Sequence, residues 1–137
     1  MAMETQVWGR VVALHTRVEG DLARALQRRH GIGISEYRAL GRLAAAEGGE
    51  LRMQELAELI GLNQSSVSRL VARLESSGLT ERALCLDDRR GVYTVITDEG
   101  RARLAGADPT YEETLRDSLD QAAADHQFDE LVAVLRS

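Results

Sequence analysis

The stretch LRMQELAELIGLNQSSVSRLVARLESSGL, residues 51–79, decides the fold. Apolar residues recur at helical spacing over 53–60 and again over 64–76, and the letters GLN separate the two patterns as a tight turn. Asn63 is a favourable N-cap for the second helix, and Gly78 is placed to end it, with Leu79 folding back. Two short helices joined by such a turn form a helix-turn-helix.

The second helix of the pair has two different faces. Its apolar stripe consists of Val67, Leu70, Val71 and Leu74. Short hydroxyl and amide side chains at the start of a helix allow close approach to the major groove of DNA, and arginine reaches a base or a phosphate. The pattern predicts these DNA-binding residues: Asn63, Gln64, Ser65, Ser66, Ser68, Arg69 and Arg73. A solvated face with helix-capping serines is the alternative reading of the same residues.

A β-hairpin is predicted directly after this helix. Residues 80–86 and 92–96 are two extended runs, joined by the charged tip DDRRG. A hairpin in this place makes the motif a winged helix, whose wing lies along the duplex. We expect Asp88 to brace the hairpin by accepting hydrogen bonds, while Arg89 or Arg90 reaches DNA. The alternative is a solvent-exposed ion cluster, in which each pair contributes under about 1 kcal/mol.

Helices are predicted on both sides of the winged motif. Helical periodicity covers 5–30, and Ser35 is expected to cap a helix that breaks at Gly48-Gly49. Thr97 is expected to cap a long helix that Pro109 kinks without ending, and a last short helix is expected over about 125–135. The predicted fold class is mostly α with a small β-hairpin wing, a winged helix-turn-helix plus terminal helices.

Composition narrows the function further. The chain has 137 residues and a formal net charge of −5, with the acidity concentrated in residues 108–137, which carry 2 Arg against 8 acidic residues. The single cysteine excludes an internal disulfide, and the three histidines have no His or Cys partner at ligand spacing. No nucleophile–base pair or phosphate loop is present, and no apolar run could span a membrane. We therefore expect a soluble cytoplasmic protein with no catalytic residues, no metal and no cofactor.

The segment ending in LESSGLTER, followed by DDRRGVYTVITDEGRARL, resembles the MarR family of bacterial transcription regulators. The family signature is a D-x-R wing, an apolar strand, L-T and then x-x-G-R. The matching residues here are Asp88, Arg90, Ile96, Thr97, Gly100 and Arg101. The resemblance extends over nearly the whole chain, but RALCL stands where the family usually has a Pro-rich ascending wing.

The resemblance implies an obligate homodimer. One MarR-like domain would occupy residues 1–137, with a DNA-binding lobe over about 35–100 and dimerisation helices over about 4–30 and 101–137. Apolar residues of the terminal helices, among them Val7, Trp8 and Leu135, exceed what one small winged domain can cover. A two-fold dimer places two recognition helices about 34 Å apart and reads double-stranded DNA with a pseudo-palindromic operator.

Members of the family also suggest an effector. The resemblance implies a repressor that releases DNA when a small phenolic or lipophilic ligand binds between the dimer helices and the DNA-binding lobe. The candidate ligand-binding residues are Trp8, His15, Tyr37, Arg38 and Tyr111. Each of them also fits an ordinary core or surface position. Apolar and acidic neighbours of Cys85 disfavour oxidant sensing. The rival function is a winged helix used for protein–protein contact, with the acidic tail as docking surface.

Overall fold

The computed structural model describes residues 2–84 and 92–137. The expected wing tip, with Asp88, Arg89 and Arg90, lies outside the described residues, as do Cys85 and Leu86. The chain forms two compact units. We call Ile32–Ala107 the winged unit, and Met1–Gly31 with Asp108–Ser137 the helical unit.

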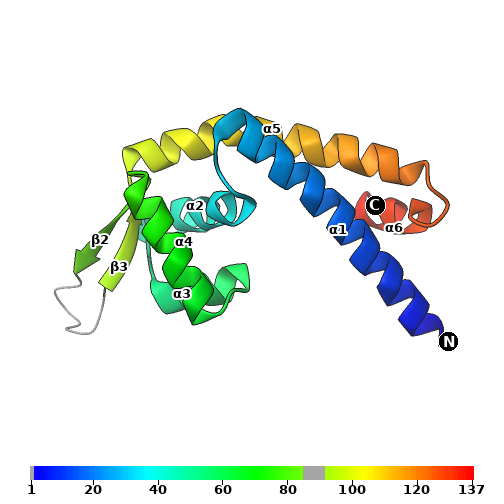
Figure 1. The fold of residues 1–137 in the computed structure, drawn as a ribbon, viewed down its shortest axis with the longest axis horizontal. Coiled ribbons are helices and arrows are strands. Elements are labelled where there is room, and N and C mark those ends of the chain that lie inside the picture. The colour runs from blue at the N-terminus through cyan, green and yellow to red at the C-terminus, as the bar shows by residue number, and fades with distance from the viewer. Residues whose placement is uncertain (1, 85–91) are drawn as a thin grey trace. The chain divides into compact units, whose positions relative to one another are not determined.

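The winged unit follows the predicted order of helices and hairpin (Figure 1). Its elements are α2 (Ile34–Ala45), the short 3-10 turn η1 (Glu47–Gly49), β1 (Glu50–Arg52), α3 (Met53–Ile60), α4 (Gln64–Ser76), β2 (Thr80–Leu84), β3 (Val92–Ile96) and the start of α5 (Asp98–Ala123). The strands form an antiparallel sheet in the order β1-β3-β2. The predicted fold class is confirmed.

The core of the winged unit consists of apolar residues of α2, α3 and α4. Leu40 and Leu43 of α2, Leu56 of α3 and the stripe of α4 are fully buried. Burying a side chain of this kind contributes roughly 1.5–3 kcal/mol, so these contacts fix how α3 and α4 pack. Leu59 has the helical spacing of a core residue of α3, but it is 46% exposed.

Two local expectations for the winged unit are corrected. Strand β1 was not predicted, because three residues are too few to show an alternating pattern, and it exists through its pairing of Leu51 with Thr94 of β3. The N-cap of α2 is Gly33 rather than Ser35. The Gly33 N–H donates to the Glu36 carboxylate over 3.3 Å, so the acidic residue three positions on supplies the cap.

The junction of β3 with α5 is tied by short hydrogen bonds, and it includes the predicted Thr97 cap. The Thr97 hydroxyl accepts from the Gly100 N–H over 3.0 Å and donates to the Gly78 carbonyl over 2.7 Å. The Thr97 N–H donates to the Leu79 carbonyl over 3.0 Å. These bonds hold the end of the wing against the turn that follows α4.

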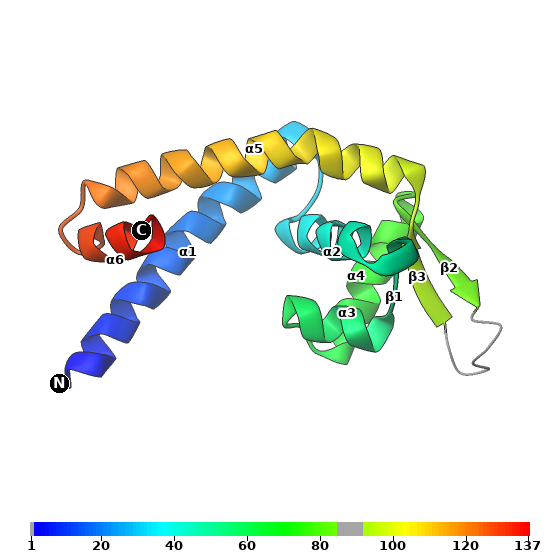
Figure 2. The ribbon, with the colours of Figure 1, turned by 180° about the vertical axis from the view of Figure 1, so that it is seen from behind.

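The helical unit contains α1 (Met3–His30), the rest of α5 and α6 (Asp129–Leu135). Within it, the C-terminal end of α1 meets α5, the two helices diverge toward the N-terminus of α1, and α6 lies between them (Figure 2). Pro109 lies inside α5 and does not end it, as expected. The last helix begins at Asp129 rather than near 125, because residues 124–128 form turns. No helix among the described residues is long and apolar enough to cross a membrane.

Polar contacts also join α1 to α5. The Ser118 hydroxyl, on a residue only 2% exposed, donates to the Asp21 carboxylate over 2.6 Å. His30 Nε2 lies 2.7 Å from the hydroxyl oxygen of the buried Thr110. Apolar contacts complete the unit, through buried Leu14, Val18, Leu22, Leu26, Ala122, Phe128 and Val132.

Candidate DNA-binding surface

The turn between α3 and α4 sets the direction of the candidate recognition helix. Gly61 ends α3 in the left-handed region at φ 73°, which glycine adopts without a Cβ penalty. Asn63 then caps α4, and its side-chain oxygen accepts the Ser66 N–H over 2.9 Å. The predicted cap is confirmed, and it fixes the first turn of α4.

Helix α4 presents its two faces as the sequence predicted. The four residues of the apolar stripe are at most 1% exposed. Gln64, Ser65, Ser68, Arg69, Ala72 and Arg73 are exposed on the other side, whereas Ser66 is half-buried. An exposed polar helix face of this kind can enter the major groove, which is about 12 Å wide.

Weak polar contacts orient the side chains of this face. Arg69 Nη2 lies 3.5 Å from the Ser66 hydroxyl oxygen. The Arg73 guanidinium is 3.8 Å from the Glu36 carboxylate of α2, and its side chain stays 57% exposed. Exposed pairs of this length contribute little to stability, so both guanidinium groups can exchange these partners for a phosphate or a base edge.

At the wing, the described residues cover the two strands. Arg82 of β2 donates to the Glu75 carboxylate near the end of α4 over 2.9 Å, which ties the ascending strand to the recognition helix. Because Asp88, Arg89 and Arg90 lie outside the described residues, the bracing and reading roles assigned to them stay predictions.

One cation near the wing was missed by sequence reasoning. The Arg52 guanidinium lies 5.5 Å from the centre of the Tyr93 ring. Arg52 is placed there because β1 pairs with β3 and sets Arg52 opposite Tyr93. The signal that could have found it is Glu55, three residues on, whose carboxylate accepts the Arg52 N–H over 3.0 Å.

The five candidate ligand residues are divided between the two units. Tyr37 and Arg38 are half-buried in α2 of the winged unit. Trp8, His15 and Tyr111 belong to the helical unit, and Trp8 is 67% exposed. His15 lines an apolar groove of about 390 Å³ with Val11, Leu14, Val18, Leu115, Leu119 and Leu135. The effector site itself stays a prediction.

No cluster of three or more His, Cys, Asp or Glu side chains that could hold a metal occurs within residues 2–84 and 92–137. The exposed face of α4 carries polar side chains, and its two arginines, Arg69 and Arg73, make only weak contacts that a DNA group can replace. Together with the wing sheet, these features define a winged helix-turn-helix protein of the DNA-binding class.

Comparison with known proteins identifies the family. The family model of the MarR family matches residues 30–91. The chain is 33% identical to Sco3205, a MarR family transcriptional regulator from Streptomyces coelicolor whose crystal structure is in complex with DNA; the match covers 99% of this chain and 86% of that one, with a TM-score of 0.83. The chain belongs to the MarR family, and it is a DNA-binding transcriptional regulator rather than an enzyme.

Other solved structures share the fold. AbsC, a MarR family transcriptional regulator from Streptomyces coelicolor, is 26% identical over 98% of this chain and 90% of that one, with a TM-score of 0.81. BpsR from Bordetella bronchiseptica is 18% identical over 99% and 94% of the two chains, with a TM-score of 0.78, and its DNA binding is regulated by 6-hydroxynicotinic acid. No curated protein is similar enough to count as a match.

Proposed function

We propose that this regulator is a homodimer that binds a pseudo-palindromic operator in double-stranded DNA and represses transcription until a small ligand releases it. The observation that carries the proposal is the exposed polar face of α4, held by a buried stripe behind it and a side-chain cap at its start. A relative 33% identical to this chain was crystallised with DNA. A regulator of this kind acts where the DNA is, which in a bacterial cell is the cytoplasm.

The contacts are divided between helix and wing in this proposal. Gln64, Ser65 and Ser68 extend from the first turns of α4 and read base edges, because amide and hydroxyl groups pair with the donors and acceptors of the major groove. Arg69 and Arg73 lie further along the same face and reach bases or phosphates. Arg89 or Arg90 contacts the minor groove or backbone at the wing tip, with Asp88 as the brace.

The helical unit supports the homodimer. Apolar side chains of α1 and α6 are exposed, including Trp8 at 67%, Leu135 at 64% and Val134 at 71%. They lie on the same two helices as residues of the 390 Å³ apolar groove. Covering this surface with a second copy removes it from water and gains free energy in proportion to the apolar area, at roughly 25 cal/mol per Å².

Release by a ligand follows from population shift. A ligand that binds one arrangement of the DNA-binding lobes more tightly than another moves the dimer toward that arrangement. BpsR, whose DNA binding is regulated by 6-hydroxynicotinic acid, has the same fold as this chain. We propose a small phenolic or lipophilic effector, with Trp8, His15, Tyr37, Arg38 and Tyr111 as the residues to test.

Selection of bound duplexes from a random pool tests the proposal. Wild-type protein is expected to enrich an inverted repeat with half-sites one helical turn apart. Gln64→Ala and Ser65→Ala should change the enriched sequence, whereas Arg90→Ala should weaken binding to all duplexes alike. The matched control is Arg116→Ala, which removes the same charge from an exposed position of α5 in the helical unit.

Three outcomes would reject parts of the proposal. Enrichment of no sequence would favour the rival function, protein–protein contact through the winged unit. Identical behaviour of the α4 and wing variants would reject the division of roles. A monomer in light scattering at micromolar concentration would reject the homodimer and, with it, the two half-sites.

A further inference from the structure

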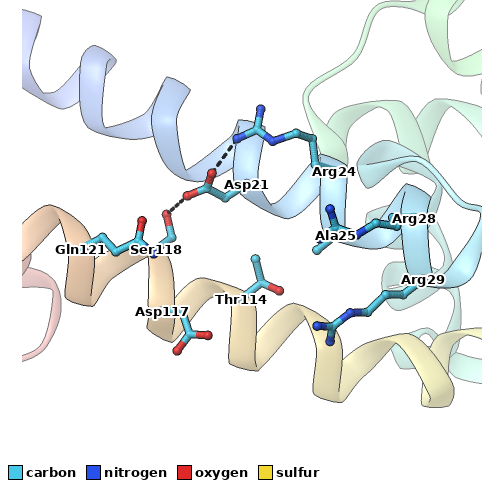
Figure 3. Close-up of a pocket in the computed structure, with 9 residues that line it drawn as sticks. All are labelled: Asp21, Arg24, Ala25, Arg28, Arg29, Thr114, Asp117, Ser118 and Gln121. Atoms are coloured by element: carbon cyan, nitrogen blue, oxygen red, sulfur yellow. Dashed lines mark hydrogen bonds and ion pairs between the residues drawn. The ribbon is translucent and has the colours of Figure 1, made fainter.

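A second groove lies within the helical unit, and its lining is polar. It has a volume of about 250 Å³ and is lined by Asp21, Arg24, Ala25, Arg28 and Arg29 of α1 and by Thr114, Asp117, Ser118 and Gln121 of α5 (Figure 3). None of the five predicted effector residues takes part in it. The apolar groove uses other positions of α1 and α5 together with Leu135 of α6, so this polar groove is a distinct feature of the helical unit.

Asp21 is already neutralised at one end of the groove. One carboxylate oxygen accepts the buried Ser118 hydroxyl over 2.6 Å, and the other accepts Arg24 Nη2 over 2.6 Å, as the dashed lines in Figure 3 show. A carboxylate paired in this way with a guanidinium has little net charge left to offer. The Asp21–Arg24 pair therefore forms a fixed, nearly neutral wall.

The remaining charge of the groove is positive. Arg28 and Arg29 line the groove from α1, and the Arg29 side chain extends toward α5 near Thr114 (Figure 3). Both side chains are exposed, and neither makes an ion pair with any residue that the structure describes. Asp117 is the one acidic lining residue that likewise has no ion pair within the described part. The groove is thus lined by two arginines and one carboxylate that make no ion pair within the described residues.

We propose that this groove binds a small oxyanion, a phosphate or a short carboxylate, between Arg28 and Arg29 of α1 and the Thr114 hydroxyl of α5. Guanidinium groups bind such oxygens in a planar fork, and the Thr114 hydroxyl adds a neutral donor near Arg29 (Figure 3). The volume lies below the usual range of about 300–1,000 Å³ for ligand pockets, so the ligand is small. The polar lining excludes a lipophilic effector, and the arginines exclude a metal cation.

Arginines at the end of a helix also have a structural role that is independent of ligand binding, and the test must separate the two roles. Arg28 and Arg29 belong to the last turn of α1, where cations stabilise the negative end of a helix dipole. Arg42 is an exposed arginine in the last turn of α2 that also makes no ion pair within the described residues. It does not line the groove, so Arg42→Gln is the matched control for charge and for the helix dipole.

The test is calorimetric titration of the full chain without DNA, with inorganic phosphate in one arm and malonate in the other, and with sodium chloride holding ionic strength constant. We expect saturable binding of at least one anion. Arg28→Gln and Arg29→Gln should each weaken it about tenfold, since a charge-assisted hydrogen bond contributes about 1.5 kcal/mol or more. Asp117→Asn should tighten binding several-fold by removing a like charge, and Arg42→Gln should change it less than twofold.

Absence of saturable heat with both anions in the millimolar range would overturn the proposal. So would equal weakening by Arg42→Gln and the groove variants, because the effect would then be one of net charge. The arm that binds distinguishes a phosphate ligand from a carboxylate ligand. Since no DNA is present, failure here leaves the proposed regulator function standing, and loss of DNA binding would leave this site standing.

Discussion

Gly100→Ala tests how tightly the wing is joined to α5. A methyl group at this position would overlap the Leu79 carbonyl oxygen and lie 2.8 Å from Ile96 Cγ1. The first of these is backbone, so it cannot move aside as a flexible side chain could. The start of α5 must shift, and the shift strains the three hydrogen bonds of Thr97 with Gly78, Leu79 and Gly100.

The magnitude follows from these bonds. Each contributes about 0.5–1.5 kcal/mol net, so losing or weakening three of them costs roughly 3 kcal/mol. Alanine regains at most about 1 kcal/mol over glycine through helix propensity. The free energy of unfolding should therefore fall by about 2 kcal/mol, which lowers the Tm by roughly 8 °C for a chain of this length.

The assay is thermal unfolding followed by circular dichroism at fixed protomer concentration, because a dimer's Tm depends on concentration. The control is Gly106→Ala in the same helix, where a methyl group meets nothing within 4 Å. The control should raise stability by about 0.5–1 kcal/mol. If both variants shift the Tm in the same direction, α5 does not approach Leu79 closely at Gly100 in solution, and the predicted strain at this junction is wrong.

Four further changes give distinct outcomes. Asn63→Ala removes the α4 cap and should cost about 1 kcal/mol in urea unfolding and weaken operator binding, whereas no change in either would reject the cap. Ser118→Ala removes the hydrogen-bond donor to one of the two Asp21 carboxylate oxygens and should lower stability by about 1–2 kcal/mol. Thr80→Val removes a buried hydroxyl that has no partner among the described residues and should leave stability equal or higher. Trp8→Glu should yield folded monomer in light scattering, and an intact dimer would contradict the assigned interface.

Most of the winged unit could be predicted from the sequence because its signals are local. Apolar periodicity defined α3 and α4 with their observed bounds, and the cap at Asn63 and the stop at Gly78 depend on neighbours a few residues away. The exposed residues of α4 could be predicted because they lie on the side of the helix opposite to the buried apolar stripe. Where a residue's position depends only on its own helix, sequence reasoning is sufficient.

Features that depend on contacts between distant segments of the chain could not be predicted from the sequence. Strand β1 forms because β3 offers it a partner, and nothing within 50–52 alone signals a strand. Leu59 looked like a core residue by its spacing, but it is 46% exposed, since its place depends on what packs against α3. The polar groove was also invisible, because it requires Arg28 of α1 and Thr114 of α5 to be brought together. The roles of Asp88, Arg89 and Arg90 remain predictions.

Fluorescence anisotropy with a labelled duplex, titrated with protein over a series of salt concentrations, tests the central claim that the exposed face of α4 and the arginine-bearing wing bind duplex DNA. The logarithm of the binding constant is expected to fall linearly with the logarithm of the salt concentration, with a slope of about −0.9 for each phosphate contacted. Arg73→Gln and Arg90→Gln should each reduce the magnitude of that slope by about 0.9, the contribution of one phosphate contact. Indifference of the wild-type protein to duplex DNA at about 50 mM salt would contradict it.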